Sequence, residues 1–452
     1  MSAIEQSNLL EVSGHKIAAP RPSLRLLDAI ALIVGLVIGA GIFETPALVA
    51  ANADSNLAVL QAWSLGGIIS IIGALCYAEL ATTYPYIGGS YDYLKRAFGQ
   101  SIATLFAWAR MSVIQTGSIA LLAFVFGDYA SQIFRLGSFS AGIYAAMAIA
   151  LLTALNILGI KHSKRLQNWL TITTILGLLA VIIIGLTLPT AAAAAPATAA
   201  VSTSRSWGSA MVFVLLSYGG WNEAAQISAE IENYRRNIVR SLLWGLGIIT
   251  AVYLLINLAY LQGLGLAGMA QSSAVAADLM RQAFGEPGAK FISILVVVCT
   301  LDSINATIFT GARTNFALGQ DVATFRWLGV WQDRHSTPTA AYLFQGAISL
   351  ALVGLGMVTR DGFKTMVDFT APIFWFFFLL SSISLLVLRV RDPDRPRPFR
   401  VPLYPILPLL FCAACGYLLY SSLVYTGTGA IVGVVVVALG IPFVVRHRQQ
   451  TR

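Results

Sequence analysis

The feature that most constrains this chain is an apolar run, Leu26 to Ala51, interrupted at its centre by Gly39-Ala40-Gly41-Ile42-Phe43. A helix needs about 20 apolar residues to cross a bilayer, and this run is long enough. The two glycines and the following Glu44-Thr45-Pro46 disfavour one continuous helix, because glycine loosens a helix and proline cannot continue a preceding one. The pattern predicts two half-helices that meet near the bilayer midplane, with Glu44 or Thr45 capping the second.

Such a break has chemical consequences. Backbone amides and carbonyls that are freed there cannot face hydrocarbon, so they contact protein, water or a ligand. The positive end of the outer half-helix suits a carboxylate. The alternative interpretation is a kinked helix that packs closely at its glycines.

The composition places the chain in a membrane. It is 57% hydrophobic and only 11% charged, whereas soluble domains carry about 25% charged residues. The first 23 residues are polar and lack the apolar core of a cleavable signal peptide. The four cysteines lie in apolar runs, and with the four histidines they show no disulfide framework and no metal-ligand spacing. We therefore expect a polytopic helical protein without a metal or cofactor.

Hydropathy predicts twelve membrane spans, and the chain divides into five segments, three of which contain these spans. The spans lie at about 24–51, 57–83, 99–130, 138–159, 167–189, 207–231, 238–262, 287–318, 338–358, 365–390, 403–424 and 428–446. The segments are a cytoplasmic N-terminal tail (1–23), the first five spans (24–189), an external alanine-rich linker (190–206), the next five spans (207–390), and the last two spans with a cytoplasmic C-terminus (391–452).

The distribution of basic residues predicts the orientation. Of the 29 Lys and Arg, 22 fall on the side that carries both termini, six fall on the other side, and Arg110 lies within a span. The positive-inside rule then places both termini in the cytoplasm. The net charge of +9 therefore reflects membrane topology, and we expect no nucleic-acid partner.

The second half of the chain repeats the break of the first. The sixth span carries Ser217-Tyr218-Gly219-Gly220-Trp221-Asn222 in its middle. The offset from the first break is five spans, an odd number, so the second copy has inverted orientation. Paired interruptions in two inverted halves indicate the binding site of a transporter.

The chain resembles the amino acid–polyamine–organocation (APC) superfamily, and within it the L-type amino acid transporter branch. The motifs that carry the resemblance are the two breaks, Tyr77-Ala78-Glu79-Leu80, Pro85, Gly88-Gly89, Tyr91, Arg165-Leu166-Gln167, Glu230, Asn233, Arg236-Asn237, Ser303-Ile304-Asn305, Arg313 and Arg397-Pro398-Phe399-Arg400-Val401-Pro402. The resemblance implies an all-α membrane protein of 12 transmembrane helices. Its LeuT-like core is a 5+5 inverted repeat with broken helices 1 and 6, and helices 11 and 12 are added.

The resemblance also implies a substrate site at the two breaks. The substrate carboxylate would bind amides around Gly39, Ala40 and Gly41, and its α-amino group would bind carbonyls near Val37 and from Ser217 to Gly219. The full set of expected substrate-binding residues is Val37, Gly39, Ala40, Gly41, Ile42, Leu216, Ser217, Tyr218, Gly219, Trp221 and Asn222. Ala40 replaces a frequent serine and Leu216 a frequent aromatic gate, so we expect an apolar pocket for neutral amino acids.

Charged residues inside spans need a reason, because each costs at least about 2.5 kcal/mol at mid-depth. Glu44 either complements the dipole of the outer half-helix or serves substrate or ion access. Arg110 is either a structural ion-pair partner or a cavity-lining group, and Glu223 either pairs with it or caps the inner half-helix. We expect Glu79 to pack against a basic loop, and the phenylalanines of residues 374–378 to serve packing.

Three residues are expected at a coupling-ion site. Many relatives carry a lysine in span five that replaces a coupling cation; that position here is Thr174. Span eight carries Asp302 where relatives commonly have a small residue, and Asn305, three residues on, should face the same side of the helix. We expect them to carry a proton or Na⁺, giving symport. The alternative for Asp302 is a structural pair with Arg110 or a buried protonated acid.

The function expected is secondary active transport of amino acids by alternating access across a bacterial-type inner membrane, with the lipid bilayer as surroundings. The chain shows no nucleophile with a base and no nucleotide loop, so it is not expected to be an enzyme. The alternatives are a polyamine or cationic amino acid carrier, a non-transporting amino acid sensor, and the light chain of a heteromeric assembly. The external loop Ser131 to Ser138 has no cysteine, so we expect no disulfide-linked heavy chain.

Overall fold

A computed structural model describes residues 25–39, 41–84, 89–158, 164–189, 206–222, 231, 233–332 and 337–442. This part of the chain is helical, apart from its loops and isolated β-bridge residues, which include the pair Gln332 and Thr337. The helices are α2 (Leu26–Val37), α3 (Gly41–Ala51), α4 (Asn56–Thr83), α5 (Ser90–Phe98), α6 (Gln100–Ala109), the π turn η2 (Arg110–Ile114), α7 (Gln115–Ile133), α8 (Ser140–Ile157), α9 (Lys164–Thr187), α10 (Trp207–Ser217), α11 (Tyr234–Gln271), α12 (Val275–Asp321), the 3-10 turn η5 (Ala323–Phe325), α13 (Thr339–Thr359), α14 (Gly362–Arg391), α15 (Ile406–Thr426) and α16 (Thr428–Ala438).

The described helices support a multi-pass membrane protein. Eight are long and apolar enough to cross a bilayer: Asn56–Thr83, Gln100–Ile133, Ser140–Ile157, Arg236–Gln271, Val275–Gln320, Thr339–Thr359, Gly362–Arg391 and Ile406–Thr426. Shorter apolar helices include Leu26–Gly35, Gly41–Ala51, Thr173–Thr187 and Trp207–Ser217. The all-helical class predicted from composition is confirmed. The count of twelve spans stays a prediction.

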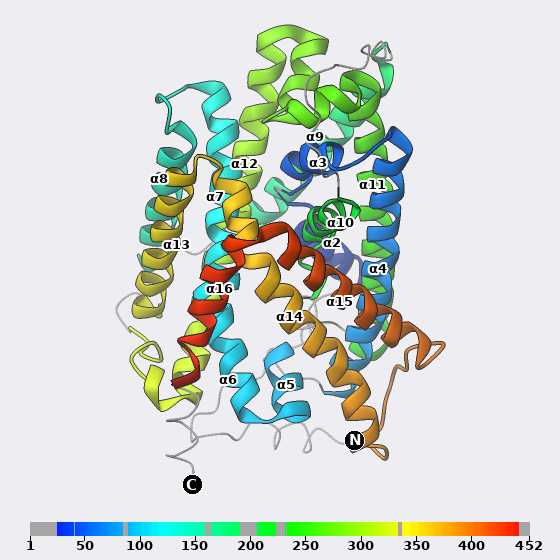
Figure 1. Ribbon diagram of the computed structural model, residues 1–452, viewed down its shortest axis with the longest axis vertical. Coiled ribbons are helices and arrows are strands. Elements are labelled where there is room, and N and C mark those ends of the chain that lie inside the picture. The colour runs from blue at the N-terminus through cyan, green and yellow to red at the C-terminus, as the bar shows by residue number, and fades with distance from the viewer. Residues whose placement is uncertain are drawn as a thin grey trace.

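The short helices lie in the middle of the molecule. Figure 1 shows α2, α3 and α10 there, with α4 and α11 on one side and α7 and α12 on the other. α11 packs against α2, α3 and α4, and α10 packs against α3. These contacts hold the short helices α3 and α10 in the middle of the bundle.

The predicted break in the first span is present, but its second helix begins earlier than expected. α2 ends at Val37 and α3 starts at Gly41. Glu44 and Thr45 therefore lie inside the first turns of α3, and the Thr45 hydroxyl donates to the Gly41 carbonyl at 2.8 Å. The expectation that either residue caps this helix is wrong, because the chain is already helical three residues before Glu44.

Two long helices change direction at a glycine. α11 departs from helical geometry at Gly265 and α12 at Gly285, close to the predicted limits of spans seven and eight. The end of α11 after its kink and the start of α12 before its kink lie together at the top of Figure 1. The predicted tail (1–23), the linker from 190 to 205 and the last ten residues lie outside the described residues.

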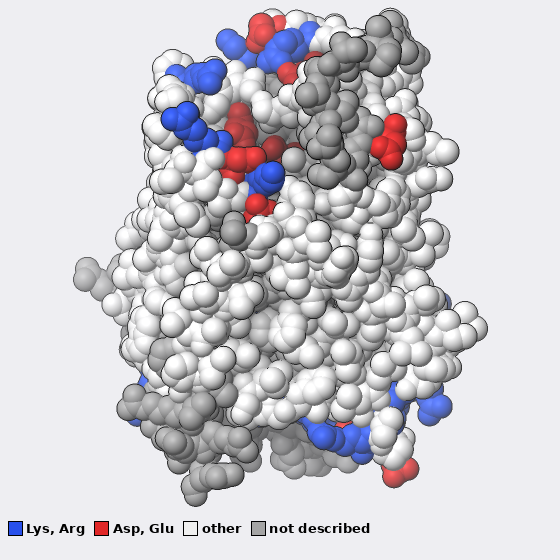
Figure 2. Space-filling model, viewed as in Figure 1, with Lys and Arg blue, Asp and Glu red and all other residues white. Residues whose placement is uncertain are grey.

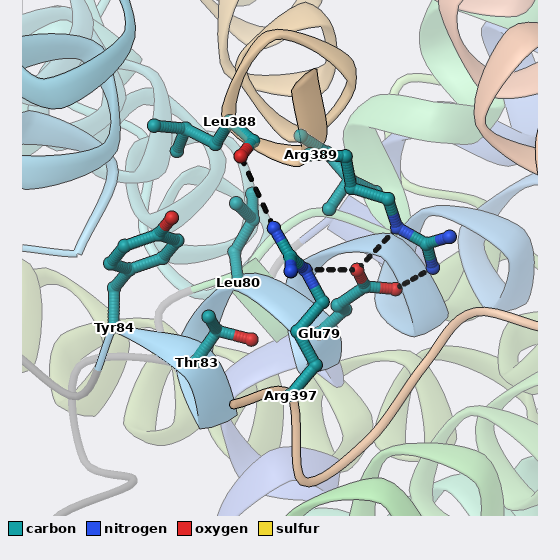
Figure 3. A pocket seen from close by; sticks show the side chains of 8 residues that line it. Glu79, Leu80, Thr83, Tyr84, Leu388, Arg389 and Arg397 are labelled. Atoms are coloured by element: carbon teal, nitrogen blue, oxygen red, sulfur yellow. Dashed lines mark hydrogen bonds and ion pairs between the residues drawn. The ribbon is translucent and has the colours of Figure 1, made fainter. Parts of the chain in front are cut away.

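The expectation that Glu79 packs against a basic loop is confirmed. Glu79 is 1% exposed and accepts hydrogen bonds from Nε and Nη2 of Arg389 at 2.7 and 2.6 Å. The backbone N–H of Val401 donates to the same carboxylate at 2.7 Å, and Nε of Arg397 lies 3.5 Å from it. Figure 3 shows both guanidinium groups converging on Glu79. One carboxylate of α4 thus anchors the end of α14 and the loop that follows it.

A tyrosine extends this anchor just beyond the end of α4. The hydroxyl of Tyr84 donates to Asp392 at 2.8 Å, and the guanidinium of Arg395 lies 4.5 Å from the centre of its ring. Burial, followed by the hydrogen bond to Asp392, raises the pKa of Tyr84 to about 12. The phenol therefore stays protonated at neutral pH and remains a hydrogen-bond donor.

Candidate functional site

The two interrupted helices touch each other at their breaks. The hydroxyl oxygens of Thr45 in α3 and Ser217 in α10 lie 2.5 Å apart. A Cβ added at Gly41 would lie 3.3 Å from the Cα of Ser217 and 3.2 Å from its hydroxyl oxygen. Glycine at position 41 therefore lets the start of α3 approach the end of α10. The structure brings together two segments that sequence analysis predicted to form one site.

The carbonyls predicted to bind an ammonium group are bridged by a tyrosine of α11. The hydroxyl of Tyr253 lies 3.0 Å from the carbonyl oxygen of Val37 and 3.0 Å from that of Ser217. The Val37 carbonyl also accepts from the backbone N–H of Gly39 at 2.8 Å. Tyr253 is fully buried and was not predicted as a site residue. Its single proton can serve only one of the two carbonyls at a time.

The side chains next to the second break point into an aromatic layer. Tyr218 donates to the carbonyl of Trp63 at 3.0 Å, and the Tyr253 ring lies 5.1 Å from the Tyr218 ring and 5.2 Å from the Trp63 ring. The ring of Trp221 lies 5.3 Å from Tyr77. The rings of Tyr218 and Trp221 therefore pack the residues of the second break against α4.

The phenylalanines of α14 serve packing, as expected. Phe378 lies 5.6 Å from Trp221 and 5.0 Å from Phe374, measured between ring centres. Phe377 and Phe378 are buried.

The other predicted substrate-binding residues lie around the two breaks. Ile42 is buried and Leu216 is partly buried. The Leu216 carbonyl accepts from Gly219 at 3.0 Å, and a Cβ added at Gly219 would lie 2.9 Å from that oxygen. Asn222 closes a short 3-10 turn with Trp221. Ala40 and Glu223 lie outside the described residues.

A small cavity lies beside the first break. It is lined by Val34, Gly35, Ile38, Thr174, Ile175, Cys299, Asp302 and Ser303, and its volume is about 20 Å³. That volume is room for about one water molecule. The Thr174 hydroxyl contacts the Cys299 sulfur at 2.7 Å. Sequence analysis paired Thr174 with Asp302, and the structure places both on this one cavity between α2, α9 and α12.

Asn305 is directed elsewhere. Its side-chain oxygen accepts from Nδ2 of Asn156 in α8 at 2.7 Å, and it is not among the residues that line the cavity. The three-residue spacing placed the oxygens of Asp302 and Asn305 on one side of a helix. Asp302 reaches the cavity, whereas Asn305 is bonded to a neighbouring helix.

Two further charges from the interior of the predicted spans, Arg110 and Glu44, lie in different helices. Arg110 begins the π turn η2, inside the continuous helix from Gln100 to Ile133. Glu44 lies in α3, where Asp128 and Asp361 are the charged groups that act on it most strongly. Glu44 is therefore near other acidic groups, which sequence analysis did not anticipate.

Comparisons with known proteins agree with this architecture. A family model described as "Amino acid permease" matches residues 24–445. The b(0,+)-type amino acid transporter 1 of Mus musculus is 30% identical over 88% of this chain and 84% of its own length. The large neutral amino acids transporter small subunit 2 of Mus musculus is 30% identical over 95% of this chain and 82% of its own. The serine/threonine exchanger SteT of Bacillus subtilis (strain 168) is 27% identical over 93% and 96%.

Proposed function

We propose that this chain, which belongs to the amino acid permease family of the APC superfamily, is a secondary active transporter that carries amino acids by alternating access. Family membership makes it a membrane permease and not an enzyme. The observation that carries the proposal is the meeting of the two helix breaks under the Tyr253 hydroxyl. The amides in the first turn of α3 and the carbonyls at the ends of α2 and α10 complement a zwitterion.

The geometry suggests how the site recognises a substrate. The amides in the first turn of α3 lack partners within their own helix and attract the substrate carboxylate. Tyr253 shares one proton between the carbonyls of Val37 and Ser217. A substrate ammonium brings three donors, so its arrival satisfies both carbonyls and frees the hydroxyl. The substrate ammonium thereby replaces the single hydroxyl proton of Tyr253 with separate donors to the carbonyls of the first and second breaks.

The substrates proposed are neutral amino acids. Ile42 is buried and Leu216 partly buried next to the breaks, and Ala40 supplies no hydroxyl. Two of the relatives point the same way by name, a transporter of large neutral amino acids and a serine/threonine exchanger. We expect leucine and similar amino acids to bind ahead of lysine, arginine and putrescine.

The proposed setting follows the distribution of charges and apolar runs. Twelve spans in a LeuT-like 5+5 inverted repeat cross a bacterial-type inner membrane, with both termini in the cytoplasm. The contact of α3 with α10 supports the pairing of the two repeats. The loop from 131 to 138 contains no cysteine, so no disulfide-linked heavy chain joins it there.

A coupling ion is proposed for the cavity between α2, α9 and α12. Its lining includes the carboxylate of Asp302 and the hydroxyl of Thr174, and it also includes Ile38 at the first break. A proton on Asp302 or one Na⁺ fits a space the size of a water molecule. Because the cavity adjoins the break, loading it stabilises the same end of α2 that binds the substrate.

The function is tested by ligand-induced stabilisation of purified protein. A ligand that binds only the folded state raises the melting temperature. We expect leucine to stabilise the wild type, and Gly41→Leu to lose this effect while still inserting into the membrane, because its side chain would clash with Ser217. Gly247→Leu is the matched control, since a Cβ added at that exposed position meets nothing within 4 Å. Unchanged leucine binding by Gly41→Leu would place the site elsewhere.

A further inference from the structure

Three arginines from α5, α14 and the loop after α14 meet beside one tyrosine ring. The guanidinium carbons of Arg96 in α5 and Arg395 in the loop lie 5.2 and 4.5 Å from the centre of the Tyr84 ring. Arg391, the last residue of α14, donates from Nη1 to the backbone carbonyl of Arg96 at 3.0 Å. We call Arg96, Arg391 and Arg395 the arginine cluster.

The ends of two helices hold the arginine cluster in place. Nε of Arg395 donates at 3.2 Å to the carbonyl of Thr83, the last residue of α4. Nη1 of Arg391 also lies 3.2 Å from the carbonyl oxygen of Ala97 in the last turn of α5. Carbonyls at helix ends lack partners within their own helix and carry partial negative charge, so they attract cations. These backbone contacts fix the guanidinium groups before a ligand binds.

Most donors of the arginine cluster remain available to a ligand. Nε of Arg96 is paired with Asp92 at 2.6 Å, whereas Arg391 and Arg395 have no ion pair among the described residues. A guanidinium carries five N–H donors, and the hydrogen bonds named above engage one nitrogen of each arginine. All three side chains are exposed to solvent. The cluster therefore presents several fixed donors at the surface.

Positive charge exceeds negative charge around the arginine cluster. The end of α4, α5, the end of α14 and the loop after it carry seven basic and four acidic residues: Lys95, Arg96, Arg389, Arg391, Arg395, Arg397 and Arg400 against Glu79, Asp92, Asp392 and Asp394. Figure 2 shows basic side chains at the bottom of the molecule, where α5 and the end of α14 lie in Figure 1. The charge and the free donors together favour an anionic ligand.

Exposed apolar side chains follow the arginine cluster along the chain. Leu403, Ile406 and Leu410 are exposed, and the ring of Tyr404 lies 3.8 Å from the guanidinium carbon of Arg389. Ile406 begins α15, which is long and apolar enough to cross a bilayer. Basic residues next to the end of a membrane helix lie at the depth of the lipid phosphates. These surroundings favour a lipid over a soluble anion.

We propose that the arginine cluster binds the phosphate group of an anionic phospholipid, of which phosphatidylglycerol is a simple example. The planar guanidinium fork matches the geometry of phosphate oxygens. The three arginines come from three segments of the chain, so one bound phosphate links α5, α14 and the following loop. The acyl chains then lie against the exposed apolar residues that begin α15. This lipid site is separate from the helix breaks and does not depend on the proposed transport function.

The test measures thermal unfolding of purified protein in detergent with added lipid. Phosphatidylglycerol should raise the melting temperature of the wild type, whereas phosphatidylcholine with the same acyl chains should not, because its headgroup has no net charge. Arg391→Gln/Arg395→Gln should need about 30-fold more phosphatidylglycerol for the same shift, since each basic group near an anionic lipid surface contributes about fivefold. Arg135→Gln/Arg360→Gln is the matched control, because it removes the same charge from exposed residues at the opposite end.

Inorganic phosphate separates a lipid site from a site for a soluble anion. At the concentration used for the lipid it should leave the melting temperature unchanged. A shift with phosphate as large as that with phosphatidylglycerol would overturn the proposal, as would equal shifts with the two lipids or equal losses in the two double variants. If Arg391→Gln/Arg395→Gln does not fold, Arg395→Gln replaces it with an expected loss of about fivefold. A wild-type response of that single variant would also reject the site.

Discussion

At the scale of single residues, Tyr253 has the most consequential position. It reaches the Val37 carbonyl, 216 residues away in sequence, and the Ser217 carbonyl, 36 residues away, with one hydroxyl. It therefore links the end of α2 to the end of α10. Buried carbonyls without a donor cost about 1–3 kcal/mol each, so this hydroxyl also stabilises the empty site.

Tyr253→Phe is predicted to weaken leucine binding about tenfold. The ring still packs against Trp63 and Tyr218, but the two carbonyls lose their shared donor, and the breaks are free to separate before substrate arrives. A tenfold loss corresponds to about 1.4 kcal/mol, which lies within the range for one buried hydrogen bond. Ligand-induced shifts in melting temperature at graded leucine concentrations measure it.

The control for this variant is Tyr144→Phe, which removes another hydroxyl that donates to a backbone carbonyl, that of Phe134 at 2.9 Å. Leucine affinity should not change there. Equal affinity of Tyr253→Phe and the wild type would mean that the hydroxyl bridge has no part in recognition.

The glycines of this candidate site are predictable from the sequence, whereas the tyrosine is not. Gly39, Gly41 and Gly219 stand out because glycine is unfavourable in the middle of an apolar helix. Tyr253 shares an apolar span with Tyr260, and no local pattern indicates that its hydroxyl faces two distant carbonyls. The caps were misplaced for a related reason: Pro46 reads as the first turn of a helix, whereas α3 begins at Gly41 and contains it.

At the scale of elements, the Glu79 anchor joins α4 to α14 and its following loop. Its energetic weight comes from burial. A buried carboxylate with several donors is compensated, but removal of its charge leaves two guanidinium groups facing each other. Figure 3 shows how closely Arg389 and Arg397 approach around this one acid.

Glu79→Gln is predicted to destabilise the protein by about 3 kcal/mol or more, the typical cost of breaking a buried ion pair. Thermal unfolding in detergent measures this as a lowered melting temperature. The double variant Glu79→Gln/Arg389→Gln should recover part of the loss, because it also removes one unpaired charge. Glu286→Gln is the control: its ion pair with Arg281 is 64% exposed on the acidic side, so its loss should cost under about 1 kcal/mol. Similar melting temperatures for Glu79→Gln and Glu286→Gln would contradict the anchor.

Helix boundaries can be predicted where the hydropathy of the sequence changes. A change of helical geometry inside an apolar run cannot be predicted in this way. The predicted limits of spans seven and eight fall near the kinks at Gly265 and Gly285, since glycine and polar residues cluster there. The π turn that begins at Arg110 has no such signal. An extra residue per turn arises from packing against neighbouring helices, which a single segment does not encode.

At the scale of the whole molecule, residues that are far apart in the sequence meet only through the packing of the helices. The acidic neighbours of Glu44, Asp128 and Asp361, could not be predicted because both stand near the ends of apolar runs, where polar residues are expected. The pair Thr174 and Asp302 was predicted because each departs from a family pattern. Its shared cavity depends on the packing of α9 against α12, which lies beyond any local motif.

The cavity makes a prediction about transport by the intact molecule. Liposomes that contain wild-type protein and no internal amino acid should accumulate leucine when a pH or Na⁺ gradient is imposed. A tenfold gradient of a coupled ion and a tenfold accumulation of substrate both correspond to about 1.4 kcal/mol, so one-to-one symport supports up to about tenfold accumulation. Asp302→Asn should lose this dependence, because the amide that replaces the carboxylate neither carries a proton nor attracts a cation.

Two controls make the result specific to the cavity. Asp394→Asn, which removes an exposed carboxylate, should accumulate leucine like the wild type, and Asp302→Asn should still be stabilised by leucine, since the helix breaks are intact. Exchange that ignores the gradient in both wild type and Asp302→Asn would assign Asp302 a structural role. The proposed coupling runs through α2: Val34 and its C-cap residue Ile38 line the cavity, and its last carbonyl, at Val37, accepts from Tyr253. We propose that an ion in the cavity and a substrate at the break stabilise the same helix end and are coupled through it.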